Sequence, residues 1–190
     1  MSVGGFVFLA LLVVSVIYLV ALFNGLVSLK NNVKTAWSNI DVLLKQRHDE
    51  LPKLVETCKQ YRDFERDTLE KVMQARAGVQ QARESGDLGA LGPAESQLRA
   101  TIGRLYAVAE AYPQLKASES FQQLQSRITG LENAIADRRE FYNDSVNLYN
   151  TRIQSFPELV IARQFGFHSG SLLEFSEADK KDVDMKALFT

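Results

Sequence analysis

The sequence contains few of the residues that build catalytic or metal sites. It has one cysteine, Cys58, and two histidines, His48 and His168. A single cysteine excludes an intrachain disulfide, so the fold must rest on side-chain packing. The sequence also has no His-x-x-x-His or Cys-x-x-Cys pair, no Walker loop, no dinucleotide fingerprint and no Gly-x-Ser-x-Gly motif. We therefore expect no catalytic residues, no metal ligands and no cofactor.

Charge of either sign is missing from residues 1–29, whereas the rest of the chain is strongly charged. The totals nearly cancel, because 22 basic and 23 acidic residues give a net charge of −1. Such a balance creates no field that would attract nucleic acid, and we expect no nucleic-acid partner. The contrast between head and body predicts an apolar attachment followed by a charged domain.

Residues 3–23 form a continuous uncharged, mostly apolar run, "VGGFVFLALLVVSVIYLVALF". As a helix the run is about 31 Å long, which matches a hydrocarbon core of about 30 Å. The alternative is a secretory signal peptide, which has a basic start, a shorter core and a small-residue cleavage site. The run has none of these features. We predict a transmembrane anchor over residues 1–24, with the lipid bilayer as the partner of residues 3–23.

The positions of the first lysines predict the orientation of this anchor. No basic residue precedes the span, whereas Lys30 and Lys34 follow it before the first acidic residue, Asp41. The positive-inside rule then places the body in the cytoplasm.

The body has the composition and the period of long helices. Apolar residues recur at alternating steps of four and three, which is typical of a helix that packs along partners. Proline and glycine divide this pattern into segments. The expected segments are a kinked long helix over 25–84, a glycine-containing loop over 84–92, a helix over 93–112, a long helix over 118–156, a short helix over 157–166 and a polar tail over 167–190.

Short links between long helices favour a chain that folds back on itself. The expected fold class is all-α: one N-terminal transmembrane helix followed by an elongated antiparallel bundle of long helices over 25–166. Coiled coils between chains are the alternative, because the same period fits seams within or between molecules.

The polar residues 47–50, Arg-His-Asp-Glu, stand just before Pro52. Neighbouring helical side chains point about 100° apart, so His48, Asp49 and Glu50 cannot converge on one ion. A metal site that joins His48 to distant ligands is the alternative. The apolar period continues through Pro52 without a shift, which predicts a kink in a continuing helix and leaves the carbonyl of His48 without its partner. Alternatively, Asp49 caps a new helix.

Charged residues interrupt the apolar stripes, where an unpaired charge is costly. We expect each such arginine to meet a carboxylate, reach solvent or contact another subunit. Tyr142 and Tyr149, which are seven residues apart, are expected to be core residues with their hydroxyls at the edge of the bundle. A ladder of ligand-binding residues is the alternative. The candidate interface or register residues are Arg47, Glu65, Glu132, Arg138, Tyr142, Tyr149 and Arg152.

Several separate segments resemble one family. They are "AWSNIDVLLKQRHDELPKLVE", "YRDFERDTLEKVMQAR", "YPQLK" and "RREFYNDSVNLYNTRIQSFPELVIARQFGF", which are similar to the LemA family of bacterial membrane-anchored proteins. The resemblance implies a single N-terminal transmembrane helix, a long helical bundle and a place in the bacterial cytoplasmic membrane. It implies no enzymatic activity and supplies no catalytic residues.

Three functions fit these features. The first is a non-enzymatic membrane-anchored scaffold that assembles laterally into a homo-oligomer, since confinement to a membrane lets weak contacts suffice. The second is a regulatory adaptor that presents a helix face, or the C-terminal tail with Leu188-Phe189 near its end, to an unidentified membrane or cytoplasmic protein. The third is an enzyme or metal carrier that uses His48, His168 and carboxylates.

Overall fold

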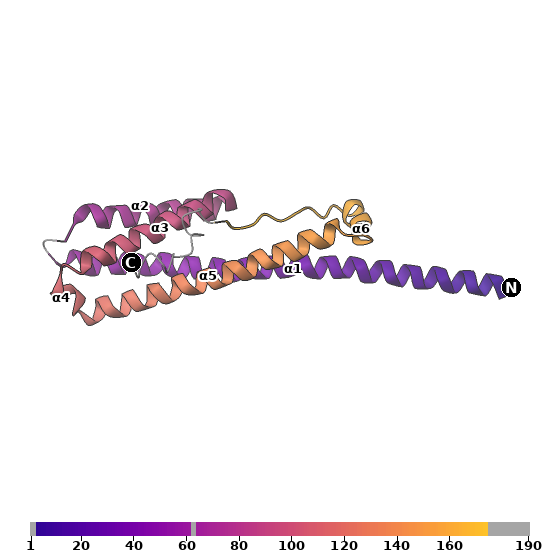
Figure 1. The fold of residues 1–190 in the computed structure, drawn as a ribbon, viewed down its shortest axis with the longest axis horizontal. Coiled ribbons are helices and arrows are strands. Elements are labelled where there is room, and N and C mark those ends of the chain that lie inside the picture. The colour runs from indigo at the N-terminus through magenta and orange to yellow at the C-terminus, as the bar shows by residue number, and fades with distance from the viewer. Residues whose placement is uncertain (1–2, 62–63, 175–190) are drawn as a thin grey trace, which may run out of the picture. The chain divides into compact units, whose positions relative to one another are not determined.

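The computed structural model describes residues 3–61 and 64–174, and within these residues it contains helices and no strand. The all-α class is confirmed. The chain divides into two compact units, and both α1 and α5 contribute to each of them. The described residues of 1–38 and 140–172 form unit 1, and those of 39–139 with 173–174 belong to unit 2. In chain order the described helices are α1 (Val3–Lys59), α2 (Arg66–Ser85), α3 (Leu88–Ala109), α4 (Pro113–Lys116), α5 (Glu119–Gln154) and α6 (Glu158–Gln164) (Figure 1).

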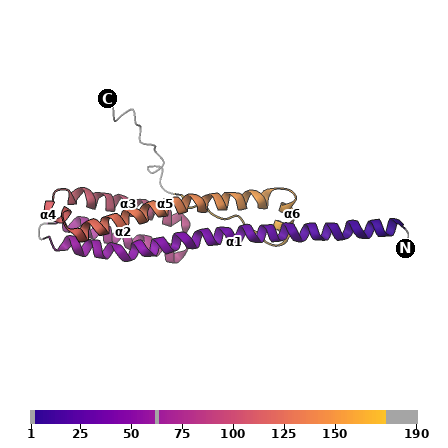
Figure 2. The ribbon, with the colours of Figure 1, turned by 90° about the horizontal axis from the view of Figure 1, so that it is seen from below.

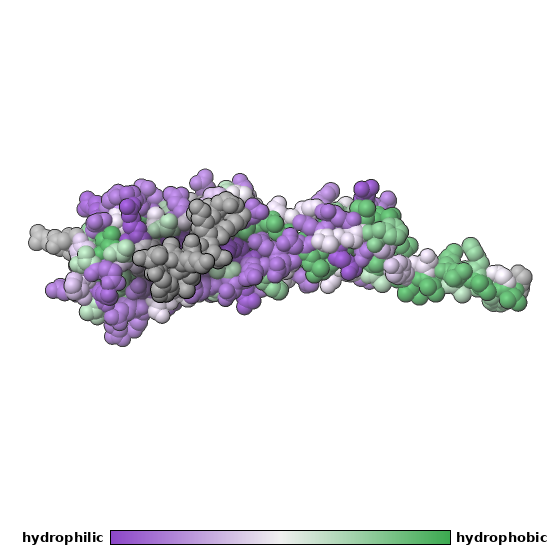
Figure 3. Space-filling view, in the orientation of Figure 1, coloured by the Kyte–Doolittle hydropathy of each residue, from purple (hydrophilic) through white to green (hydrophobic). Residues whose placement is uncertain are grey.

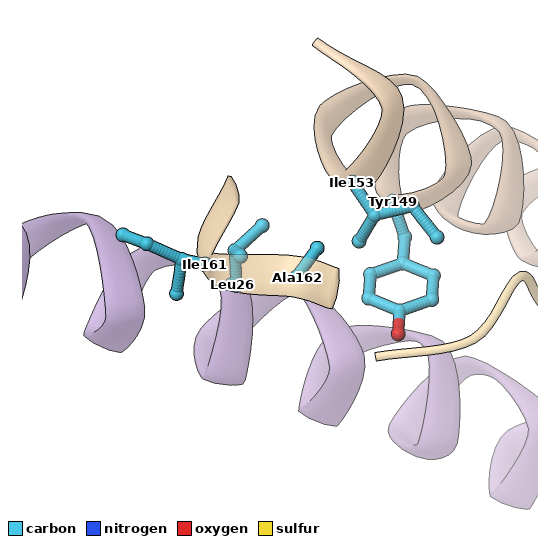
Figure 4. Close-up of a cluster of buried hydrophobic side chains, with 5 residues drawn as sticks. All are labelled: Leu26, Tyr149, Ile153, Ile161 and Ala162. Carbon is cyan, nitrogen blue, oxygen red and sulfur yellow. The ribbon is translucent and has the colours of Figure 1, made fainter. Parts of the chain in front are cut away.

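Unit 1 contains the first part of α1, the end of α5 and the short helix α6. Its core is a cluster in which Leu26 of α1 meets Tyr149 and Ile153 of α5 and Ile161 and Ala162 of α6 (Figure 4). An edge contact between the rings of Trp37 and Tyr142, 5.8 Å between centroids, joins α1 to α5 further along. Unit 1 is therefore held together by apolar and aromatic contacts.

Unit 2 is an antiparallel arrangement of the second part of α1 with α2, α3 and the first part of α5 (Figures 1 and 2). Two α1–α2 contacts give the direction, because His48 meets Arg76 and Asp41 meets Arg83. The number on one helix rises as the other falls, so α1 and α2 run in opposite directions. The helices bury an apolar interior that includes Ile40.

The prediction of a single helix over 25–84 is wrong. The first helix begins at Val3, so the anchor and the body share one helix without a break at residue 24. It ends at Lys59, and the chain reverses before α2 begins at Arg66. No glycine or proline marks this reversal. It is fixed by tertiary contacts instead, since the buried Phe64 packs on Tyr112 with 5.2 Å between ring centroids.

The prediction of a loop over 84–92 is also wrong. The connection is short: Gly86, with φ of 68°, ends α2 in the left-handed conformation that glycine adopts freely, and Asp87 starts α3. The Asp87 carboxylate accepts a hydrogen bond from the amide of Ala90 at 3.1 Å, which is an N-cap. Helix α3 therefore begins at Leu88 instead of residue 93, and Pro93 lies in its second turn.

The last helices lie close to their predicted ranges, but the tail does not begin at residue 167. Helix α5 ends at Gln154, before Pro157, and α6 follows. The next residues pack on unit 1: Asn150 bonds the backbone of Gly170 through both amide atoms, and Tyr142 donates to the carbonyl of Ser171 at 2.9 Å. The predicted tail segment over 175–190, including Leu188-Phe189, lies outside the described residues.

Candidate functional site

A buried arginine lies at the centre of unit 2. Arg47 of α1 is 1 % exposed and donates to Glu95 of α3 at 2.5 Å and to Glu132 of α5 at 2.6 Å. Glu95 is as deeply buried as the arginine, whereas Glu132 is partly exposed. The guanidinium thus joins three helices through charge-assisted hydrogen bonds. Removal of one partner would leave a charge buried without compensation.

The protonation of this triad follows from competition between burial and charge. Burial alone lowers the pKa of Arg47, but the carboxylates of Glu95 and Glu132 outweigh it, and the net pKa is raised. Burial raises the pKa of Glu95, and the Arg47 charge opposes that effect only in part. Glu132 adds to the rise through like-charge repulsion. The arginine therefore stays charged. Glu95, whose pKa is raised, binds a proton more readily than an ordinary glutamate does.

Pro52 lies inside α1, and the helix continues through it, as the sequence predicts. A proline lacks the N–H that would bond the carbonyl four residues earlier, which belongs to His48. Arg76 of α2 supplies the missing donor, because its Nε donates to the His48 carbonyl oxygen at 2.9 Å. The proline therefore creates an acceptor that a neighbouring helix uses.

The same arginine contacts the ring of His48. A guanidinium has donors only, so the Nε2 atom of His48 that lies beside Arg76 is the acceptor and the ring is neutral. Burial lowers the pKa of His48, and the Arg76 charge lowers it further. His48 is consequently a structural residue of the α1–α2 contact. The adjacent Asp49 is exposed, and no helix begins there.

Glu50 is buried, with 6 % of its surface exposed. Its Oε1 atom accepts from Arg127 of α5 at 2.7 Å and from Lys53 at 3.1 Å. Asp41 and Arg83 form a further pair between α1 and α2, and the hydrogen bond from Arg83 lowers the pKa of Asp41. A line of ion pairs along α1 therefore ties this helix to each neighbouring helix of unit 2.

Unit 1 exposes two groups of apolar residues. On α5, Phe141 and Leu148 are 53 % and 54 % exposed and lie seven residues apart, with Ser145 between them. We call these three residues the α5 stripe. At the other end, Phe156, Val160 and Phe165 are exposed around α6, and we call these three residues the α6 cap. Exposed apolar residues that gather on one face are typical of interaction sites.

The candidate register residues fall into different places. Arg47 and Glu132 form the expected kind of pair. Tyr142 and Tyr149 are buried core residues, 4 % and 3 % exposed, as the core interpretation predicts.

The others do not lie in a seam. Glu65 is exposed at the start of α2, where it accepts a hydrogen bond from Thr68 and pairs with no arginine candidate. Arg138 is exposed on α5. Arg152 is also exposed, and it pairs with Glu158 of α6 at 2.5 Å. Arg138 and Arg152 lie beside the buried face of α5 instead of on it. Arg152, for example, comes one residue before the buried Ile153.

Sequence reasoning missed Glu95 and Glu50. Glu95 lies three residues before Leu98, so extending the four-three pattern of α3 by one step back places it on the buried face. Glu50 lies three residues after Arg47 and four before Leu54, both buried. In each case the helical spacing from buried neighbours pointed to a buried position, but the charge of the side chain argued against burial.

The described residues hold no cluster of three or more histidine, cysteine or acidic side chains able to bind a metal ion. Cys58 is buried, and burial raises its pKa to about 12, so its thiol is not a ready nucleophile. The ion pairs of Asp41, Arg47 and Glu50 join helices of unit 2. The arrangement can fix helix register and has no assembled catalytic constellation among the described residues.

One described helix, α1, is long and apolar enough to cross a membrane, judged by length and composition. The window that could span is not covered by other parts of the protein, and Figure 3 shows its hydrophobic surface. The fold and the site thus define a class: an all-helical protein with an N-terminal membrane-spanning candidate and a helical body held by buried ion pairs.

The comparison with protein families identifies the group within that class. The model of the LemA family matches residues 36–186, and the chain belongs to the LemA family. The match includes the triad, the Pro52 site and both exposed regions. The resemblance seen in the sequence is confirmed.

Three relatives are similar to this chain over most of their own length. Protein LemA of Metamycoplasma hominis is 29 % identical over 87 % of this chain and 74 % of its own length. Magnetosome protein MamQ 2 of Paramagnetospirillum magneticum is 23 % identical over 95 % of this chain and 77 % of its own. Magnetosome protein MamQ of Magnetospirillum gryphiswaldense is 25 % identical over 83 % and 69 %. The family and these relatives fit a membrane-associated helical protein.

Proposed function

We propose that the protein is a non-enzymatic scaffold, anchored in the bacterial cytoplasmic membrane by α1, that assembles laterally into a homo-oligomer. The observation that carries the proposal is the α5 stripe. Phe141 and Leu148 are more than half exposed on a helix whose buried side carries Tyr142 and Tyr149. A second copy of the stripe would remove this apolar surface from water.

The membrane supports this pairing through geometry. Copies anchored in one bilayer by their N-terminal helices have the same direction, so a two-fold axis between them runs along the membrane normal. Such an axis brings each α5 stripe against the same residues of its copy. Confinement in two dimensions raises the effective concentration, so a small contact suffices.

The proposed orientation places the body in the cytoplasm. Lys30 and Lys34 follow the apolar run of α1 before the first acidic residue, and both are exposed. Basic residues next to a span favour the cytoplasmic side. The charged helical body suits a role in organising other molecules at the membrane more than a role in chemistry.

The test is native mass spectrometry of the full-length protein released from detergent micelles. The expected result is a dimer or larger homo-oligomer, and a shift towards monomer in the variant Phe141→Ser with Leu148→Ser. The matched control is Val42→Ser, which changes an exposed apolar residue of α1 in unit 2. A monomer in the unaltered protein rejects the scaffold and favours a regulatory adaptor that binds a different protein.

A further inference from the structure

We propose that the α6 cap enters the membrane interface beside α1, so that the protein contacts the bilayer at two places. The partner is the lipid surface at the boundary of headgroups and acyl chains. This inference rests on the proposed membrane anchoring and adds a second contact, made by residues that are more than a hundred positions after the span.

The level of α6 along α1 is the first argument. Residues 6–21 of α1 are exposed without interruption, and Leu22 and Phe23 begin the part that unit 1 covers. The ring of Phe23 makes edge contacts with the rings of Phe165 and Phe167, at centroid distances of 5.0 and 5.8 Å. The α6 region therefore packs on α1 where the apolar run ends, beside the part of α1 that extends alone towards its N-terminus (Figure 1).

The exposure of the cap is the second argument. Phe156 is 83 % exposed, Phe165 63 % and Val160 62 %, while Ile161 and Ala162 on the other side of α6 are buried against Leu26. The segment is thus apolar on both sides, one facing the protein core and one facing outwards. A segment of this kind, placed at the end of a membrane span, meets lipid on its outer side. Interfacial segments of proteins insert apolar side chains about 5–10 Å into that boundary.

The charges around α6 fit anionic headgroups. Arg163 is exposed on α6, and Lys30 is exposed on α1. The ammonium of Lys30 lies 5.7 Å from the centre of the Phe167 ring, at the same end of the unit. Glu158, the acidic residue of α6, is buried and neutralised by Arg152. Long basic side chains beside apolar ones reach lipid phosphates while the apolar groups lie deeper.

The experiment uses tryptophan fluorescence, because the chain has a single tryptophan, Trp37. In a full-length Trp37→Phe background, Phe156→Trp and Val160→Trp each place one indole on the cap. The proteins are reconstituted in vesicles of phosphatidylcholine and phosphatidylglycerol brominated in the upper acyl chain. Both cap variants are expected to lose a large share of their emission, whereas the control Phe141→Trp, on the α5 stripe, keeps its emission.

A further variant separates this inference from the anchor. The indole of Val13→Trp lies within the apolar run and is expected to be quenched by the same lipids. If Val13→Trp is not quenched, the proposed anchoring itself is wrong. If Val13→Trp is quenched and both cap variants, with normal helix content by circular dichroism, are not, the second contact is overturned. A blue-shifted but unquenched cap indole shows that protein covers the cap, and it overturns the lipid contact as well.

Discussion

The Nε atom of Arg76 donates a hydrogen bond at 2.9 Å to the main-chain carbonyl oxygen of His48, the acceptor that Pro52 leaves without a helical partner. A proline inside a long helix is ordinarily a cost. Here the freed carbonyl is used to join α1 to α2, so the local defect contributes to tertiary structure.

This relationship predicts a coupling between two positions. Arg76→Ala is expected to lower the free energy of unfolding by about 1–2 kcal/mol, because it leaves a partly buried carbonyl without a donor. In a Pro52→Ala background the amide of residue 52 can bond the carbonyl, so the same change costs less. Urea unfolding in detergent, followed by circular dichroism, measures both costs. Equal costs in the two backgrounds contradict the role assigned to Arg76.

The triad predicts a large effect at Arg47. Arg47→Met leaves the carboxylates of Glu95 and Glu132 without their cation and is expected to cost about 3–5 kcal/mol of unfolding free energy. The matched control is Lys71→Met, which breaks an ion pair whose two members are both exposed and is expected to cost below about 1 kcal/mol. The same denaturation experiment compares them.

Neutralising the carboxylates should reverse the loss. In the variant Arg47→Met with Glu95→Gln and Glu132→Gln, no charge is left unpaired, and much of the stability should return. A triple variant no more stable than Arg47→Met would show that the arginine acts through packing instead of through charge.

His48 predicts a dependence of stability on pH. Its pKa is lowered in the folded protein from the ordinary value of 6.5, so the folded state favours the neutral ring. Its contribution is therefore complete above about pH 6.5 and declines as the pH falls below that value, because the unfolded chain then binds a proton that the folded state does not. The difference in unfolding free energy between the unaltered protein and His48→Gln should shrink as the pH falls from 8 to 5, a pH range chosen to span the titration. A constant difference would show that His48 does not titrate differently on folding.

The period of apolar residues predicted the helices but not every end. It indicated Tyr142 and Tyr149 as core residues and named Arg47 and Glu132 among the residues that fix register. It could not locate the reversal after Lys59. The connecting residues include no glycine or proline, and Phe64 among them is apolar, so the sequence shows no break there. Gly89 and Gly92 suggested a loop because glycine weakens helices, yet the Asp87 cap starts α3 before them.

Buried charges were the other limit. Glu95 and Glu50 occupy inward positions of their helices, but a carboxylate alone argues against burial. Only the approach of Arg47 and Arg127 from neighbouring helices makes burial acceptable, and that information lies in the tertiary structure. Contacts between residues that are distant in the sequence therefore decide which carboxylates are buried, and the local pattern does not contain them.

The central claim, lateral assembly through α5, is tested most directly by cysteine cross-linking in membranes. Leu148→Cys places a thiol on the α5 stripe of the full-length protein, and Asn147→Cys places one at an exposed neighbour about 100° around the helix. The native Cys58 is fully buried, so the unaltered protein is the background control. Oxidation is expected to give a disulfide-linked dimer with Leu148→Cys and little or none with Asn147→Cys. No dimer with Leu148→Cys, or equal amounts at both positions, would contradict assembly through this face.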